Sequence, residues 1–270
     1  MGLGGVLGGF IGGLLGIGGA PIYLAVYWQV VPQLYPNLSD VQTTQIIIAN
    51  TVVVRTFAAL SGCYSHYKNG NFYADTVIAI SIPATVVSLV IIFALSFVEY
   101  TKAYFSIIFI LVFIPLLYQM FFDDMSKKHF NQPNRVKVFY LNLIGVFCGA
   151  ITALTGLGAG FVVVPLLNNF FNIKIRKVAS ISLGVIFLSS VFVVFYYVLF
   201  FHSLHGQLPY SLGALSLPLV APPIVLGFLS SPYGVRLSRK LSPQALRYIF
   251  LSFCVLIILN EVHQLIETLK

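Results

Sequence analysis

Hydrophobic residues run in long stretches along the chain, and short polar segments separate them. A helix needs about 20 apolar residues to cross a bilayer. Six stretches approach or reach that length: Ile46–Tyr64, Val77–Phe97, Ala103–Phe122, Ala179–Phe201, Ser211–Leu229 and Ala245–Leu265. The pattern therefore predicts six full transmembrane helices.

Two further apolar stretches, Gly2–Val31 and Val138–Phe171, are broken by glycine near the middle. Glycine costs about 1 kcal/mol per helix position relative to alanine, so these breaks predict unwound backbone. A new half-helix is expected to begin near Ala20 and near Gly160. We call the two breaks the first tip and the second tip; they read Gly16-Ile17-Gly18-Gly19-Ala20 and Thr155-Gly156-Leu157-Gly158-Ala159-Gly160.

The two broken stretches also indicate an internal repeat. A shift of 140 residues places Gly5, Val6, Gly9, Leu14, Gly16 and Gly18 on Gly145, Val146, Gly149, Leu154, Gly156 and Gly158. A shift of 136 places the segment 66–70 on the segment 202–206, and each begins with histidine and ends with glycine. We therefore predict repeat 1 over residues 1–122, a cytoplasmic linker over 123–137 and repeat 2 over 138–270.

The distribution of Lys and Arg favours one topology, because cytoplasmic loops carry an excess of these residues. If both broken stretches cross the membrane, the charges divide six to eight between the two sides. If both are hairpins of two half-helices, twelve charges share one side and only Lys102 and Lys270 lie on the other. The hairpins are the preferred prediction, with two kinked full spans as the alternative.

The predicted fold class is an all-α polytopic membrane protein made of two inverted repeats. Each repeat would have three full transmembrane helices plus a glycine-broken hairpin, and both termini would lie outside. The hairpins would enter from opposite faces, so that the tips meet near the midplane. Inverted repeats with broken helices are typical of secondary transporters.

The composition agrees with a membrane location. Apolar residues make up 59% of the chain, charged residues only 8%, and the mean hydropathy is +0.95. Soluble domains carry about 25% charged residues, so a soluble protein is excluded. The net charge of +8 fits cytoplasmic loops better than nucleic-acid binding. The expected location is the cell (plasma or inner) membrane, with the lipid bilayer as partner; a homodimer is left open.

No metal or cofactor is expected, and the enzyme class is disfavoured. Cys63, Cys148 and Cys254 lie scattered in apolar runs, which is no disulfide framework and no metal site. A membrane-embedded enzyme would need a nucleophile, an acid–base pair or a metal cluster within the spans. Asp40, Asp75, Glu99 and Glu261 all lie near predicted span ends. Without an apparent acid or histidine near the midplane, a passive or anion-exchange mechanism is expected rather than proton coupling.

The tips are the candidate binding site. Glycine lets backbone N–H groups approach a ligand, and a half-helix that starts after each tip offers the positive end of its dipole, which favours anions. The alternative is close helix packing, which we assign to Gly4, Gly8 and Gly12 because they recur every four residues. The candidate residues of the tips are Gly16, Gly18, Gly19, Ala20, Thr155, Gly156, Gly158, Ala159 and Gly160.

Arg55 is the sharpest single candidate, because it is the tenth of nineteen residues in the span Ile46–Tyr64. A central Arg costs about 2.5–3.5 kcal/mol on insertion scales, so it should face a cavity, a carboxylate or a ligand. With no carboxylate within the central part of any predicted span, Arg55 suggests an anionic substrate. The alternative is that Arg55 caps backbone carbonyls of a neighbouring broken helix.

Polar residues beside the tips could complete a shell around an oxyanion. Thr43, Thr44 and Gln45 precede the span that contains Arg55, and Asn50 lies further in. Ser180 and Ser182 occupy the matching place in repeat 2. The alternative is that these side chains bond their own backbone. His66, His202 and His205 are expected in solvated loops.

Several motifs resemble the TauE/SafE family, also called the sulfite exporter family. They are Gly16-Ile-Gly18-Gly19, its copy from Gly156 to Pro165, the His-x3-Gly loops at 66 and 202, and the segment Leu241–Arg247. Ala20 and Ala159 replace glycines of the family motif. The resemblance runs nearly end to end and implies a transporter of sulfite, organosulfonates or related small anions, usually outward, with the tips as the substrate region. An anion channel with the same site is the nearest alternative.

Overall fold

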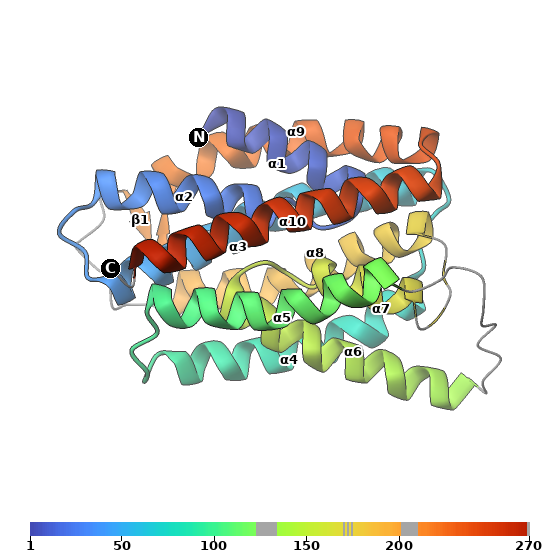
Figure 1. The fold of residues 1–270 in the computed structure, drawn as a ribbon, viewed down its shortest axis with the longest axis horizontal. Helices are drawn as coiled ribbons and strands as arrows, with labels where there is room; N and C mark the ends of the chain where they lie inside the picture. The colour runs from blue at the N-terminus through green and yellow to red at the C-terminus, as the bar shows by residue number, and fades with distance from the viewer. Residues whose placement is uncertain (123–133, 170, 172, 174, 201–209, 269–270) are drawn as a thin grey trace.

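The computed structural model describes the chain except residues 123–133, 170, 172, 174, 201–209 and 269–270. The described residues form ten helices and one pair of two-residue strands (Figure 1). The helices are α1 Gly2–Leu15, α2 Ala20–Leu34, α3 Asp40–Lys68, α4 Ala74–Leu95, α5 Lys102–Phe122, α6 Asn134–Thr155, α7 Gly160–Asn169, α8 Ile175–Leu199, α9 Leu217–Lys240 and α10 Pro243–Thr268. The antiparallel strands are β1 Ser211–Leu212 and β2 Leu215–Ser216.

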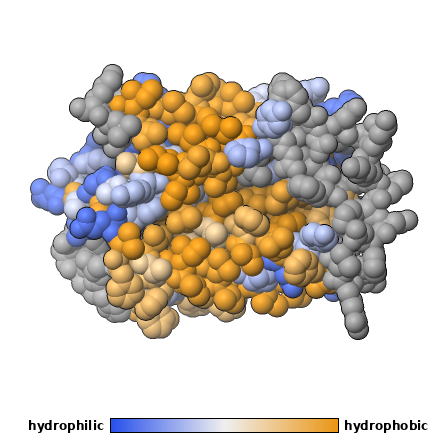
Figure 2. Space-filling model, turned by 60° about the horizontal axis from the view of Figure 1, so that its bottom comes forward, coloured by the Kyte–Doolittle hydropathy of each residue, from blue (hydrophilic) through white to orange (hydrophobic). Residues whose placement is uncertain are grey.

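The helices run along one common direction, as a bundle that crosses a bilayer requires (Figure 1). Among the described residues, six helices are long and apolar enough to span a membrane: α3, α4, α6 from Val138, α8, α9 and α10. Figure 2 shows a broad hydrophobic belt across the molecule, with hydrophilic residues toward its ends. The prediction of an all-α polytopic membrane protein is confirmed.

Helix α3 is longer than the predicted span Ile46–Tyr64, because its first turn carries a capping box. The Ser39 side chain accepts a hydrogen bond from the Gln42 N–H at 3.2 Å, and the Gln42 side chain accepts one from the Ser39 N–H at 3.0 Å. These reciprocal bonds satisfy N–H groups that a helix start leaves free. Thr43, Thr44 and Gln45 therefore lie inside α3, not ahead of it.

The expectation of a solvated His66 is wrong. His66 lies in the last turn of α3 and is only 1% exposed. Its Nδ1 lies 3.2 Å from the Asn71 side-chain nitrogen, within hydrogen-bond distance. His202 and His205 lie outside the described residues.

Helix α9 starts later than the predicted span Ser211–Leu229 and continues to Lys240. Residues 211–216 instead form the β1–β2 hairpin, whose turn contains Gly213 at φ 59°. The Ser216 N–H donates to Asn50 Oδ1 at 3.1 Å, so the hairpin is fixed to α3. Ala214 and Leu215 of this segment are buried by protein contacts, whereas Leu212 is exposed, and Pro218 then opens the helix.

Helices α1 and α2 form an antiparallel hairpin. A Cβ added to Gly4 would lie 2.9 Å from Val26, one added to Gly8 would lie 2.6 Å from the Tyr23 ring, and one added to Gly12 would lie 2.6 Å from Gly18. As the residue number of the glycine increases, the residue number of its partner decreases. The two segments therefore run in opposite directions, which Figure 1 also shows. Gly4, Gly8 and Gly12 pack α1 against α2 and its preceding turn, as the sequence pattern indicated.

The first half of each broken segment packs on a helix of the other half of the chain. Glycines at 5, 9 and 13 place α1 against residues 223, 227 and 231 of α9. Glycines at 145 and 149 place α6 against residues 80 and 84 of α4. In both cases the partners rise in number together, so each pair of helices is parallel. The first half of the chain thus contributes α1 to one contact and α4 to the other, and the second half contributes the corresponding helices α6 and α9.

Several basic residues gather at one end of the bundle. Arg176 donates to the Leu241 carbonyl at 2.5 Å, and Arg239 donates to Asn69 Oδ1 at 2.5 Å. Asn71 donates to the Arg176 carbonyl at 3.4 Å. The connections α3–α4, α7–α8 and α9–α10 therefore meet at the same end, which Figure 1 shows opposite the C-terminus.

Candidate functional site

The first tip is a turn of left-handed backbone between α1 and α2. Gly16, Gly18 and Gly19 have φ of 77°, 70° and 75°, a region that side chains with a Cβ rarely enter. The Gly16 N–H donates to the Gly12 carbonyl at 2.9 Å and ends α1. Helix α2 then starts at Ala20, where Pro21 fits the first turn. The chain breaks where the glycine spacing predicts.

The second tip repeats this geometry between α6 and α7. Gly156 and Gly158 have φ of 66° and 89°. Thr155 Oγ1 donates to the Ile151 carbonyl at 2.7 Å and accepts from the Leu157 N–H at 3.3 Å, which holds the start of the turn. The thiol of Cys148 points at the Ala159 carbonyl at 3.8 Å. Helix α7 starts at Gly160.

The two tips touch inside the protein. A Cβ added to Gly160 would lie 2.7 Å from Ile17 Cα and 2.8 Å from the Gly16 carbonyl oxygen. Every residue from Gly16 to Pro21 and from Thr155 to Pro165 is buried. The start of α7 therefore lies against the turn that leads into α2, in a region closed to solvent, and the positive end of a helix there favours negative charge.

Arg55 reaches the second tip. The side chain is 0% exposed, and its Nη1 donates a hydrogen bond to the Gly156 carbonyl. Its Nη2 donates to Ser190 Oγ at 3.1 Å. Within the described part of the chain, the buried Nε–H has no hydrogen-bond partner. The guanidinium thus caps a carbonyl of the broken helix, as the alternative interpretation expected. Its Nε–H remains available to donate a hydrogen bond to a ligand.

The charge of Arg55 is not balanced by a carboxylate in the described residues. Both bonds go to neutral oxygens, those of the Gly156 carbonyl and the Ser190 hydroxyl. A buried cation without a counter-ion is costly, and cations inside proteins are normally paired. An anion bound at the tips would supply the missing charge.

Ser182 holds the first tip as Arg55 holds the second. Its Oγ donates to the Gly16 carbonyl at 2.6 Å, and a Cβ added to Gly16 would lie 2.6 Å from Ala179 of the same helix α8. A Cβ added to Gly156 would lie 3.2 Å from Ile48 of α3. Each tip is therefore fixed by a helix from the other half of the chain.

The structure brings together only part of the predicted site. The tips, Arg55 and Ser182 meet, whereas Thr44 and Ser180 bond carbonyls of their own helices, at 2.8 and 2.9 Å. Asn50 donates to the Ala214 carbonyl at 3.3 Å and anchors the β1–β2 hairpin. Thr43 is buried in the first turns of α3.

Gln45 is placed differently from the other polar candidates. It lines a small pocket with Ile48, Ala153, Tyr100 and Tyr197, next to the second tip. Ile48 belongs both to this pocket and to the surroundings of Gly156. Tyr100 closes one side, since its hydroxyl donates to the Leu154 carbonyl at 2.7 Å. The pocket therefore approaches the buried tips from the α4–α5 connection.

Sequence reasoning missed three residues of the site. Ser190 accepts a hydrogen bond from Arg55, and Ile186 lies 3.4 Å from the position of a Cβ added to Gly18. Thr51 lies one helical turn before Arg55, and its buried Oγ1 has no hydrogen-bond partner among the described residues. A signal for Ser190 was present, because it lies two turns after Ser182 and residues at that spacing share a helix face. Among the described residues, no group of three His, Cys, Asp or Glu could hold a metal ion.

The model of the family "Sulfite exporter TauE/SafE" matches residues 1–260. The chain belongs to this family. The match confirms the resemblance drawn from the tip motifs, and it covers both tips and Arg55. The protein is thus a membrane transporter of the TauE/SafE type.

Two relatives are similar along most of the chain. A "Probable membrane transporter protein" of Methanocaldococcus jannaschii is 26% identical over 246 residues, covering 88% of this chain and 85% of the relative. A "Probable membrane transporter protein" of Haemophilus influenzae is 24% identical over 267 residues, covering 95% of this chain and 94% of the relative. No solved structure matches the chain.

Proposed function

We propose that the protein carries a small oxyanion, sulfite or an organosulfonate, out of the cell through a site between the two tips. The observation that carries the proposal is Arg55, a fully buried cation that bonds only neutral oxygens beside the second tip. A compact anion placed there would pair with the guanidinium and lie near the starts of α2 and α7.

The chemistry of the lining suits a sulfur oxyanion. A guanidinium has five N–H donors, of which two make the bonds to Gly156 and Ser190. Thr51 adds a buried hydroxyl without a partner. Gly18 lies beside the base of the Arg55 side chain, because a Cβ added to it would lie 3.4 Å from Ile186 and 3.7 Å from Arg55 Cβ. Donors on Arg55 and on Thr51, one helical turn apart on α3, match an anion with several equivalent oxygens.

Burial of both tips supports a carrier over a channel. A channel needs a continuous water path, whereas residues 16–21 and 155–165 are all buried. A carrier closes its site between two openings and exposes it to each side in turn. The reciprocal contacts of α1 with α9 and of α6 with α4 support inverted repeats that could exchange roles in this way.

The proposed orientation puts the end with Arg176 and Arg239 in the cytoplasm and both termini outside. This orientation rests on the excess of Lys and Arg at that end. A cell-negative potential of 100 mV favours the exit of an anion by about 2.3 kcal/mol per unit charge. Outward transport would then need no further energy source.

Reconstitution of the purified protein in sealed vesicles tests the proposal. The panel should include sulfite, sulfate, thiosulfate, taurine, sulfoacetate and short carboxylates. The expected result is saturable flux of sulfite or a sulfonate, accelerated by the same anion on the opposite side. Flux that rises linearly with concentration and shows no such acceleration would favour the channel, and no flux of any anion would refute the proposal.

A further inference from the structure

A buried carboxylate lies inside α10, at a position that the sequence pattern assigned to a span end. Glu261 is only 3% exposed, although seven residues and about 10 Å of helix separate it from Thr268. Ser106 Oγ of α5 lies 3.3 Å from Glu261 Oε2 and can donate to it. The anion site proposed above makes no use of this carboxylate.

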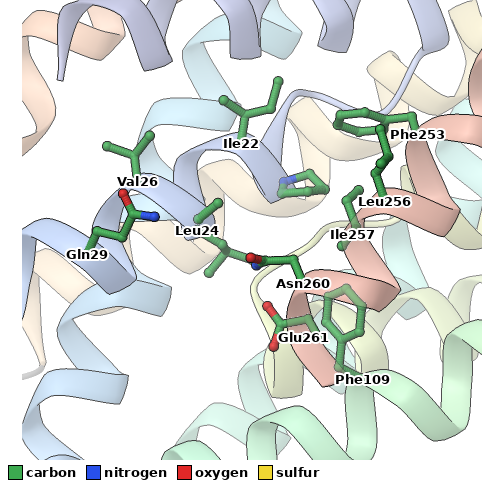
Figure 3. Close-up of a pocket in the computed structure, with 12 residues that line it drawn as sticks. Ile22, Leu24, Val26, Gln29, Phe109, Phe253, Leu256, Ile257, Asn260 and Glu261 are labelled. Carbon is green, nitrogen blue, oxygen red and sulfur yellow. The ribbon is translucent and has the colours of Figure 1, made fainter. Parts of the chain in front are cut away.

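The Glu261 side chain borders a pocket between α2, α5 and α10. Figure 3 shows Glu261 and Asn260 directed from α10 toward α2, with Phe109 of α5 beside them. Gln29 of α2 supplies another polar group, and apolar side chains line most of the remaining wall. An ionised carboxylate is costly in such surroundings.

Within the described part of the chain, no cation forms an ion pair with the Glu261 carboxylate. Lys102 of α5 is the cation whose field acts on Glu261, but its ammonium group lies 4.8 Å from the centre of the Trp28 ring. The Lys102 backbone N–H donates to Asp40 Oδ2 of α3 at 3.2 Å. On the α2 side, Gln29 lines the pocket as a neutral amide, and His263 of α10 itself is exposed. No ion pair among the described residues therefore holds Glu261 in its charged form.

The pocket and the first tip share one helix. Pro21 and Ile22, directly after the tip, line the same pocket as Glu261. Helix α2 thus has its start at the proposed anion site and its side against the carboxylate. We infer that Glu261 is a proton-binding site that couples the protonation of α10 to the movement of α2, and through α2 to the anion site.

The step involves one proton and no other bond. A proton from water near Gln29 and Asn260 binds a carboxylate oxygen of Glu261 and removes its charge, which allows α10 and α2 to close over the pocket. Loss of the proton restores the charge and favours an open, hydrated pocket. The inference rests on the proposed anion transport, and it replaces the passive mechanism expected from the sequence with proton-linked transport.

Infrared difference spectra of the purified full-length protein between acid and alkaline pH test proton binding directly. The wild-type protein should give a titrating band of a protonated carboxyl group. That band should be absent from Glu261→Gln and kept in Glu99→Gln, a control at an exposed carboxylate. If Glu261→Gln does not fold, Ser106→Ala should change the pH at which the band titrates. A band unaffected by these changes overturns the inference.

Transport in vesicles tests the coupling. Glu261→Gln should keep exchange of sulfite for sulfite, while accumulation driven by a pH gradient should fall about tenfold, within the range of coupling between linked sites. Glu99→Gln should keep both. Absence of exchange in the wild-type protein would refute the proposed function. Normal exchange with equal gradient-driven accumulation in the wild type and Glu261→Gln would overturn the role of Glu261 alone.

Discussion

The guanidinium of Arg55 on α3 bonds the backbone carbonyl of Gly156, the first glycine of the second tip. The bond joins the first half of the chain to the broken helix of the second half. It fixes a positive charge beside an unwound backbone, at a depth where water is excluded. Variants of Arg55 and of the tip glycines separate the role of this charge from the packing of the glycines around it.

The first prediction compares Gly158→Ala with Gly18→Ala. Both residues have left-handed φ, of 89° and 70°, so each alanine should cost about 1–2 kcal/mol of stability. Only the alanine at 158 would clash with the Arg55 guanidinium, since its Cβ would lie 2.6 Å from Nη1, whereas a Cβ at 18 would lie 3.7 Å from Arg55 Cβ. Anion affinity, measured with the melting temperature, should therefore fall more in Gly158→Ala.

Gly70→Ala is the matched control for backbone strain. Gly70 has φ 67°, and no atom lies within 4 Å of an added Cβ. It should lose stability like the tip variants and keep its anion affinity. Equal affinities in Gly158→Ala, Gly18→Ala and Gly70→Ala would mean that the tip glycines serve the backbone alone.

The second prediction concerns Ser182 and Ser180, neighbours on α8 with different partners. Ser182 bonds the Gly16 carbonyl across the two halves of the chain, whereas Ser180 bonds the Lys177 carbonyl of its own helix. Ser182→Ala should lower the stability by about 1 kcal/mol and weaken transport, because it leaves a tip carbonyl without its donor. Ser180→Ala should change neither. Thermal unfolding and uptake of both variants check this, and equal behaviour would remove Ser182 from the site.

The third prediction concerns topology. In a protein whose three native cysteines are replaced, Asn37→Cys and Lys68→Cys are two separate variants. Each has a single thiol at an exposed position, the first just before the start of α3 and the second at its end. An impermeant thiol reagent added to intact cells should label Asn37→Cys and not Lys68→Cys. The reverse pattern would invert the proposed orientation, and labelling of both from one side would contradict α3 as a full span.

The sequence predicted the tips well, because glycine spacing acts locally. Left-handed backbone at Gly16 and Gly156 follows from three glycines within a few residues, whatever surrounds them. The start of α3 was misplaced because the Ser39 and Gln42 capping box outweighs the polar character of the residues that follow. The predicted span starts too early at Ser211 because Ala214 and Leu215, which the protein itself buries, have the same hydropathy as residues that face lipid.

The polar part of the site was harder to predict, because it depends on contacts between distant segments. Ser180 and Ser182 are alike in the sequence, and only the position of Gly16 against α8 separates them. Hydropathy places Glu261 near the end of a span, whereas in the structure it is buried between α10, α2 and α5. Hydropathy along the chain carries no information about such neighbours.

Equilibrium binding of labelled sulfite, and of a sulfonate, to purified wild-type protein, Arg55→Lys and Arg55→Gln tests the central claim most directly. Arg55→Gln should fold, because it also removes an unpaired buried charge, and its affinity should fall by tenfold or more, about 1.4 kcal/mol. Arg55→Lys should keep part of the affinity, since the charge remains while the planar group is lost. Wild-type affinity in a folded Arg55→Gln would make Arg55 a structural cap of Gly156 and would contradict an anion site at the tips.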